Sequence, residues 1–208
     1  MEMSITYHDR PGPSNTQATL RLARERIDAL GIRQVVVSST SGDTGMKAMK
    51  LFQGLKVVVV GVHTGPHYHD REQQVVQYFS PKARQIIEAK GGAVLISTHA
   101  FGGVNHALRN QLGWSGNPVG LIAMGLIAFG VGMKVSCEIT MMAADAGLLD
   151  TTEDAVAIGG SGQGVDTAVV LRPVNANRFF DLRVKEIICK PRQGKWAQKR
   201  DPDLPHFD

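Results

Sequence analysis

A turn rich in hydroxyl groups and glycine follows directly on an apolar, strand-like run in the segment VVVSSTSGDTG, residues 35–45. Glycine lets the backbone turn tightly, and the helix expected to start near Thr44 has N–H groups without intrahelical partners. Such a loop can bind a phosphate through amides and hydroxyls, without a lysine. A capped strand-to-helix turn is the alternative, because the Asp43 carboxylate repels an anion unless it caps the helix. The candidate residues of this serine loop are Ser39, Thr40, Ser41, Gly42, Asp43 and Thr44.

A second glycine-rich segment, GGSGQGVD, occupies residues 159–166. It matches neither the GxGxxG nor the GxSxG pattern, and it precedes a strand instead of opening a helix. Its four glycines are more than a hairpin turn needs, which favours close approach of the backbone to a ligand over a plain turn. The candidate residues of this glycine loop are Gly159, Gly160, Ser161, Gly162, Gln163 and Asp166.

Histidines and threonines follow two further strand-like runs, in the segments HTGPHYH and THAFGG. The H-x3-H-x-H spacing of His63, His67 and His69 could bind zinc together with a carboxylate or water. This spacing lies in a loop with glycine and proline, so no helix fixes the ligand geometry. Surface histidines without a ligand, or contact with the polar edge of a bound molecule, are therefore favoured over a metal. The candidate contacts are His63, Thr64, Thr98 and His99.

Glu138 lies among apolar residues in a segment expected to be helical. An acidic side chain is seldom fully buried without a partner. Glu138 is therefore either a hydrogen-bonding post between helices or a carboxylate directed into the site.

Strands and helices alternate along the chain. The β-branched apolar runs predict buried strands, and Ser, Asn and Pro caps with terminal glycines predict the helix ends. The predicted strands cover residues 34–39, 56–62, 93–98, 155–160, 166–173 and 180–189. The predicted helices cover residues 14–31, 44–52, 80–91, 117–129 and 134–148.

This alternation predicts an α/β fold in three layers with a mostly parallel sheet. The connection over residues 160–166 is too short for a crossover, so the fourth and fifth strands are antiparallel if they are neighbours. Ligands of such sheets bind beyond the carboxyl ends of the strands, where both loops and the histidines are expected. The helix over residues 118–130 is apolar nearly all round, which predicts burial in the core or in a subunit interface.

Composition excludes several classes of protein. Part of the net charge of +4 comes from the segment KPRQGKWAQKR, and aromatic residues are not interleaved with the basic ones, so nucleic-acid binding is not expected. The apolar, charge-free stretch over residues 118–133 is too short to span a bilayer. The two cysteines lie far apart and no signal-peptide pattern opens the chain, so we expect free thiols and a cytoplasmic location.

The order of these motifs resembles the C-terminal α/β domain of pyruvate kinases. The residues that carry the resemblance are a helix with SNT, a strand with SSTSGDT, two strand–helix units and AVAIGGSGQGVDTAVVLRPV. CEITMMAADAGLL and IGGSGQGVDTAVVLRP are most similar to stand-alone prokaryotic proteins built on that domain. The resemblance covers about residues 7–191, which predicts one domain over residues 1–191 and a polar tail over residues 192–208.

The resemblance implies a sheet of strand order 3-2-1-4-5 with the last strand antiparallel, which places the two loops side by side. In pyruvate kinases these loops hold the phosphates of a sugar bisphosphate effector. For the stand-alone proteins the implied ligand is flavin mononucleotide (FMN), with its phosphate at the serine loop and its ring near His63, Thr64 and His99. The barrel of pyruvate kinase is missing, so phosphoryl transfer from phosphoenolpyruvate is not implied.

The function expected from the sequence is therefore binding of a phosphorylated, nucleotide-like molecule, FMN in particular. One alternative is a metal-dependent enzyme that uses His63, His67 and His69. Another is a non-catalytic regulatory module that assembles through residues 118–130. Homo-oligomerisation is compatible with all three, and no nucleophile–base set is tied together by spacing.

Overall fold

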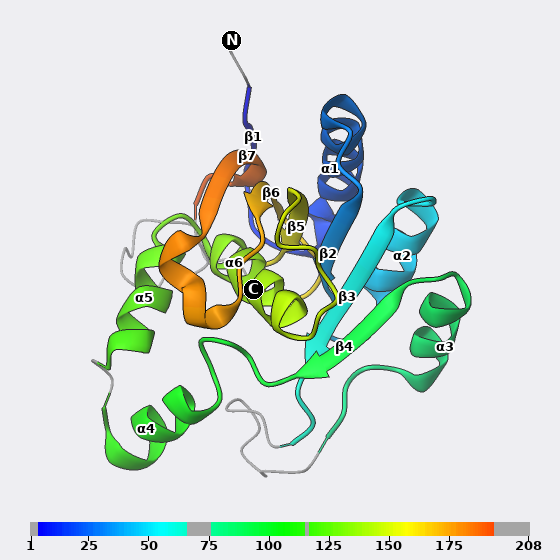
Figure 1. The fold of residues 1–208 in the computed structure, drawn as a ribbon. Coiled ribbons are helices and arrows are strands. Elements are labelled where there is room, and N and C mark those ends of the chain that lie inside the picture. Colours follow the sequence, from blue (N-terminus) through cyan, green and yellow to red (C-terminus); the bar gives the residue numbers. More distant parts are fainter. Residues whose placement is uncertain (1–3, 66–75, 115–116, 194–208) are drawn as a thin grey trace.

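The computed structural model describes residues 4–65, 76–114 and 117–193. A seven-stranded mixed sheet in the order β1-β7-β6-β5-β2-β3-β4 runs through the molecule (Figure 1). Only β6 is antiparallel to its neighbours, and the other pairings are parallel. The strands are β1 (Thr6–His8), β2 (Gln34–Ser38), β3 (Lys56–Val62), β4 (Ala93–Ser97), β5 (Ala155–Gly159), β6 (Thr167–Arg172) and β7 (Arg183–Pro191).

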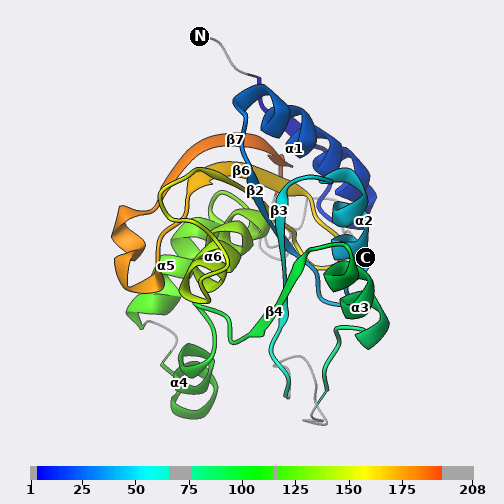
Figure 2. The same cartoon turned by 45° about the vertical axis from the view of Figure 1, so that its right-hand side comes forward.

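Helices cover both faces of this sheet, so the fold has three layers (Figure 2). α1, α2 and α3 pack on one face, and α6 packs on the other with α5 beside it. The helices are α1 (Thr16–Leu30), α2 (Asp43–Leu51), α3 (Pro81–Ala89), α4 (Val104–Leu112), α5 (Pro118–Ile127) and α6 (Val131–Asp145), with the short 3-10 helices η1 (Pro13–Asn15) and η2 (Ala176–Asp181).

The core consists of two apolar layers that the central strands separate. Successive side chains of a strand point to opposite faces. Val35 and Val37 of β2 accordingly pack with α1, α2 and α3, whereas Val36 packs with α6. All three valines are fully buried, which explains why these strands read as continuous β-branched runs.

The predicted α/β class and mostly parallel sheet are confirmed. Strands β4, β3, β2, β5 and β6 follow one another, with β5 and β6 antiparallel. The predicted sheet was too small, because β7 and β1 extend it beyond β6, and the antiparallel strand is therefore not the last one. β1 has three residues and pairs Thr6 with Cys189, so no local pattern indicates it.

Two of the predicted N-terminal caps are also confirmed, whereas the Asn15 side chain does not cap α1. Ser80 Oγ accepts a hydrogen bond from the Ala83 N–H at 3.4 Å, and Asn117 Oδ1 accepts one from the Gly120 N–H at 3.0 Å. α1 ends at Gly31, which has the left-handed conformation that favours glycine. α4 was not predicted. The division between a domain at residues 1–191 and a tail stays a prediction, since residues 194–208 lie outside the described ones.

The prediction that residues 118–130 form a buried core helix is wrong for this chain. Ala123 is the residue of α5 that is buried, whereas Leu121 is 61% exposed and Met124 is 55% exposed. The helix is apolar around its whole circumference, but one side of it packs on the core of this chain. The remaining sides face outward. The alternative of a subunit interface is taken up below.

Cys137 and Cys189 are free thiols, as predicted, and both are buried. Burial raises the pKa of the Cys137 thiol to about 12 and that of Cys189 to about 11. Both sulfurs are therefore protonated at neutral pH, where the thiolate is the nucleophilic form. Among the described helices, none has the length and apolarity that a bilayer-spanning segment requires.

Candidate functional site

The serine loop and the glycine loop lie next to each other at the carboxyl-terminal edge of the parallel strands. β2 and β5 are paired neighbours, with Val37 opposite Ile158, and each loop begins where its strand ends. The first turn of α1 contacts the glycine loop, because the Val165 N–H donates to Thr16 Oγ1 at 3.2 Å. The N-terminal ends of α1, α2 and α6 thus surround the loops, and helix N-termini favour negatively charged groups.

The serine loop uses much of its own hydrogen-bonding capacity. The N–H groups of Gly42 and Gly45 donate to Ser39 Oγ at 3.1 and 3.3 Å, and the Asp43 N–H donates to Ser41 Oγ at 3.3 Å. Ser39 is therefore a buried cap for the N-terminus of α2. This capping corresponds to the alternative that the sequence left open for the loop.

Other amides of this loop stay available. Within the described part of the chain, the N–H groups of Thr40, Ser41 and Thr44 donate no hydrogen bond. Gly42 has φ of 98°, and a Cβ on it would overlap Ala83 at the start of α3. Packing of the loop on α3 therefore explains this glycine, whether or not a ligand is bound.

Asp43 is exposed at the first position of α2, where a negative side chain stabilises the helix. Its side chain lines a groove of about 380 Å³ between α2 and α3. Lys47, Lys50 and Lys90 line the same groove. Asp43 therefore faces lysines along the outside of α2.

Asp166 organises the glycine loop from within. Its carboxylate is fully buried and accepts three hydrogen bonds, from the N–H of Gly12 at 3.0 Å, the N–H of Ser161 at 3.3 Å and the hydroxyl of Thr167 at 2.9 Å. These bonds tie the loop to the segment that precedes α1. Asp166 thus holds the loop in shape and has its acceptor oxygens directed to the protein itself.

Two glycines of this loop are required by contacts within the chain. A Cβ on Gly159 would overlap the Gly132 carbonyl of α6, and one on Gly160 would overlap the Gly164 carbonyl. The close backbone approach predicted at these positions exists, and the approaching group is the protein's own backbone. The tip remains open, because the described hydrogen bonds do not involve the N–H groups of residues 162–164, and Gly162 and Gln163 are exposed.

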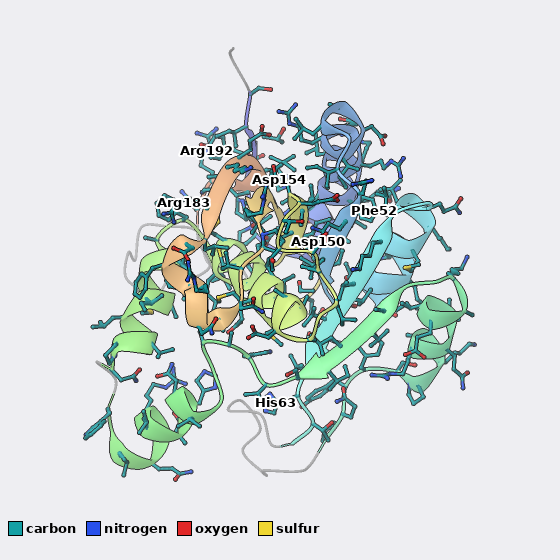
Figure 3. All side chains as sticks on the ribbon, in the orientation of Figure 1. Phe52, His63, Asp150, Asp154, Arg183 and Arg192 are labelled. Carbon is teal, nitrogen blue, oxygen red and sulfur yellow. The ribbon has the colours of Figure 1, made fainter. Side chains whose placement is uncertain are left out.

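The predicted histidine contacts lie at the same edge of the sheet, two strands further on. β3 and β4 are paired with Val62 opposite Ser97, which brings His63 and His99 together. Their rings meet edge to face with centroids 5.8 Å apart. Figure 3 shows His63 just beyond the end of β3. The candidate threonines flank this pair and are exposed: Thr64 and Thr98.

His67 and His69 of the proposed metal set lie outside the described residues. Within the described ranges, no three His, Cys, Asp or Glu side chains are grouped so that they could hold a metal ion. The metal-dependent alternative therefore has no further support from the fold.

Glu138 connects two segments through hydrogen bonds, which is one of its two predicted roles. Its carboxylate is 2% exposed; Oε1 accepts the Phe101 N–H at 2.9 Å, and Oε2 accepts from Lys134 Nζ at 2.5 Å. The Glu138 carboxylate connects α6 to the segment between β4 and α4 instead of connecting two helices. Lys134 was missed by the sequence reasoning, although the K-x3-E spacing that forms the pair was visible.

The polar cluster is completed by a third histidine, His106 of α4, which the sequence reasoning also missed. Burial lowers the pKa of His99 and of His106, the effect of nearby charges being smaller. Both imidazoles are therefore neutral near pH 7, and each has one nitrogen that can accept a hydrogen bond. We call His63, His99, His106, Lys134 and Glu138 the polar cluster.

The site as a whole is elongated. β5, β2, β3 and β4 are consecutive, so three strand spacings of about 4.8 Å separate its two ends by about 14 Å. Unpaired backbone amides lie at one end and the polar cluster lies at the other. The arrangement can bind an anion and, some distance from it, a ring with polar edges.

Comparison with known proteins gives weak similarities. No protein-family model matches the chain. A pyruvate kinase from Cryptosporidium parvum matches at 11% identity over 76% of this chain and 23% of the kinase, with a TM-score of 0.38. O-ureido-L-serine synthase matches at 17% identity over 63% of this chain and 48% of the synthase, with a TM-score of 0.29. The chain thus spans less than half the length of either protein, and the function has to be argued from the site itself.

Proposed function

We propose that this protein binds a phosphorylated, nucleotide-like small molecule, FMN in particular, across the carboxyl-terminal edge of its sheet. The observation that carries the proposal is the adjacency of β2 and β5, which brings two loops with unpaired amides together. Ligands of α/β sheets bind at such an edge. The length of the site suits a molecule with a phosphate at one end and a ring at the other.

At the phosphate end of the site, backbone N–H groups are the available donors. The N–H groups of Thr44 and of residues 162–164 are the donors that would hold the phosphate, next to the N-terminus of α2. Amides at a helix N-terminus bind phosphate without a cationic side chain. This agrees with the absence of lysine and arginine from both loops.

The ring end suits a polar heterocycle. His63, Thr64, Thr98 and His99 would contact the ring of FMN, whose carbonyl and N–H groups need both donors and acceptors. The imidazole of His99, which is neutral near pH 7, provides one donor and one acceptor. When FMN is bound, its ring supplies two-electron redox chemistry, and the chain's own residues bind and orient it.

Ser41→Glu tests the phosphate end. A carboxylate about 4 Å from a phosphate charge costs about 1–4 kcal/mol, so we expect the affinity for FMN to fall about tenfold or more. Ser41→Gln has the same size without the charge and is expected to retain most of the affinity. Isothermal titration calorimetry with FMN measures both variants, and riboflavin, which lacks the phosphate, is the second ligand.

Riboflavin affinity is expected to be the same in both variants, because the added charge acts on the phosphate alone. Equal FMN affinity in the glutamate and glutamine variants would show that the phosphate lies elsewhere.

We also infer that the protein forms homo-oligomers through an apolar patch on α4, α5 and η2. α5 and η2 share a small apolar cluster of buried and partly buried side chains, and other large apolar side chains in and next to these elements are exposed. Contiguous exposed apolar surface is typical of interaction sites. The exposed members of the patch are Leu112, Trp114, Leu121, Met124, Phe129 and Phe180.

Met124→Glu is therefore expected to shift the protein toward the monomer, since a charge would be buried in the interface. Sedimentation velocity measures the assembly, and Val184→Glu, at an exposed apolar position on β7, is the matched control. A wild type that sediments as a monomer at all concentrations would contradict the inference.

A further inference from the structure

Lys134 and Glu138 form an ion pair in the interior, one turn apart on α6. The side chains are 17% and 2% exposed, and Lys134 Nζ lies 2.5 Å from Glu138 Oε2. Glu138 also accepts the Phe101 N–H, but a glutamine oxygen could do the same without a charge. Burying a carboxylate is costly unless its partner is fixed in place. The charge of Glu138 thus has an effect that an amide would not have, because it holds the ammonium group of Lys134 at a defined position.

α6, the helix that holds this ammonium, lies between the glycine loop and the segment that carries His99. Two residues before Lys134, Gly132 is packed so closely on Thr167 that a Cβ would overlap its side chain. Two residues after it, Ser136 packs against Gly159, at 2.8 Å from the place of a Cβ on that glycine. The first two turns of α6 therefore contact the end of β5 and the start of β6, which border the glycine loop.

In the other direction, the Lys134 ammonium lies 5.8 Å from the centre of the Phe101 ring, in the segment that carries His99. Its charge acts on both His99 and His106, and so does that of Glu138. Among the described residues, Arg109 is a further charged side chain near these histidines; it is exposed on α4 and acts on His106. A ring bound beside His99 therefore lies near the ammonium of Lys134, with the carboxylate of Glu138 deeper in the protein.

We propose that Lys134, positioned by Glu138, stabilises negative charge on the ring of the bound ligand and thereby sets the reduction potential of bound FMN. The inference rests on the proposed function, and it adds a residue and a property to the same site. With dithionite as the reductant, two electrons and one proton from solvent enter the ring, which then carries one negative charge. A fixed cation beside the ring favours this charged form over the neutral oxidised form.

The test compares the affinity for oxidised and reduced FMN in variants of Lys134. The double variant Lys134→Met/Glu138→Gln removes both charges and keeps an acceptor for the Phe101 N–H, so no buried charge is left unpaired. We expect its affinity for reduced FMN to fall about tenfold relative to oxidised FMN. For a two-electron couple this equals a midpoint potential about 30 mV more negative. Lys134→Arg keeps the charge and is expected to keep the wild-type ratio.

Lys185→Met is the matched control. The Lys185 ammonium pairs with Asp154 at 2.7 Å, and Asp154 lies at the other end of the strands from His63 (Figure 3). Removing this lysine lowers the net charge by one unit, whereas the double variant leaves the net charge unchanged; the loss of the distant Lys185 is nevertheless expected to leave the potential unchanged. If the double variant binds FMN and the bound FMN has the wild-type midpoint potential, this inference is overturned and the proposed function is not. Failure of the wild type to bind FMN overturns the proposed function and the inference together.

Discussion

Replacing Asp166 with alanine is expected to lower the free energy of unfolding by about 3–5 kcal/mol and to abolish FMN binding. The fully buried carboxylate accepts hydrogen bonds from Gly12, Ser161 and Thr167. Alanine would leave two N–H groups and a hydroxyl without partners, and each unsatisfied buried group costs about 1–3 kcal/mol. Urea unfolding measures the stability, and calorimetry measures the binding of FMN.

Asp43→Ala is the control for this prediction, because Asp43 is exposed at the first position of α2. Its loss is expected to cost about 0.5 kcal/mol. If Asp166→Ala were as stable as Asp43→Ala, the glycine loop would not depend on the buried carboxylate, and the account of that loop would be wrong.

Replacing Glu138 with alanine is expected to have a similarly large effect at the ring end of the site. The variant leaves the ammonium of Lys134 without its partner in the interior and the Phe101 N–H without its acceptor. Removing one member of a buried ion pair costs about 3–5 kcal/mol. The segment between β4 and α4, which carries His99, should loosen, and hydrogen exchange at the Phe101 amide measures this directly.

Glu138→Gln separates the two roles of the carboxylate. Glutamine can accept the Phe101 N–H but cannot neutralise Lys134, so we expect protection of the Phe101 amide to remain and part of the stability to be lost. Faster exchange at Phe101 in the glutamine variant, equal to that in the alanine variant, would contradict the hydrogen bond assigned to Glu138.

Elements with local signals were predictable from the sequence. The valine runs of β2 and β3 and the Ser80–Pro81 and Asn117–Pro118 caps depend on neighbours in the chain, and the structure has the corresponding strands and helices. β1 and the place of β7 depend on pairing between the two ends of the chain, which no local pattern encodes. α4 was missed although Val104, Leu108 and Leu112 recur at helical spacing, and the structure buries none of its residues.

The site was predictable in location but not in the direction of its side chains. Strand ends are visible in the sequence, so both loops and the histidine pair were found. Asp166 points inward because of contacts with distant parts of the chain, such as the Gly12 N–H, which the sequence does not list. Ser39 caps its own helix through local bonds to Gly42 and Gly45, in line with the capped turn that the sequence left as the alternative. The spacing of Lys134 and Glu138 is also visible, whereas their burial and the approach of His106 appear only in the fold.

A crystal structure of the protein soaked with FMN tests the central claim most directly, which is that one ligand spans the two loops and the polar cluster. The account predicts the phosphate within hydrogen-bonding distance of the Thr44 N–H and the N–H groups of residues 162–164, and the ring beside His99 and Lys134. A phosphate bound in the groove between α2 and α3, or a ring placed away from the polar cluster, would contradict it.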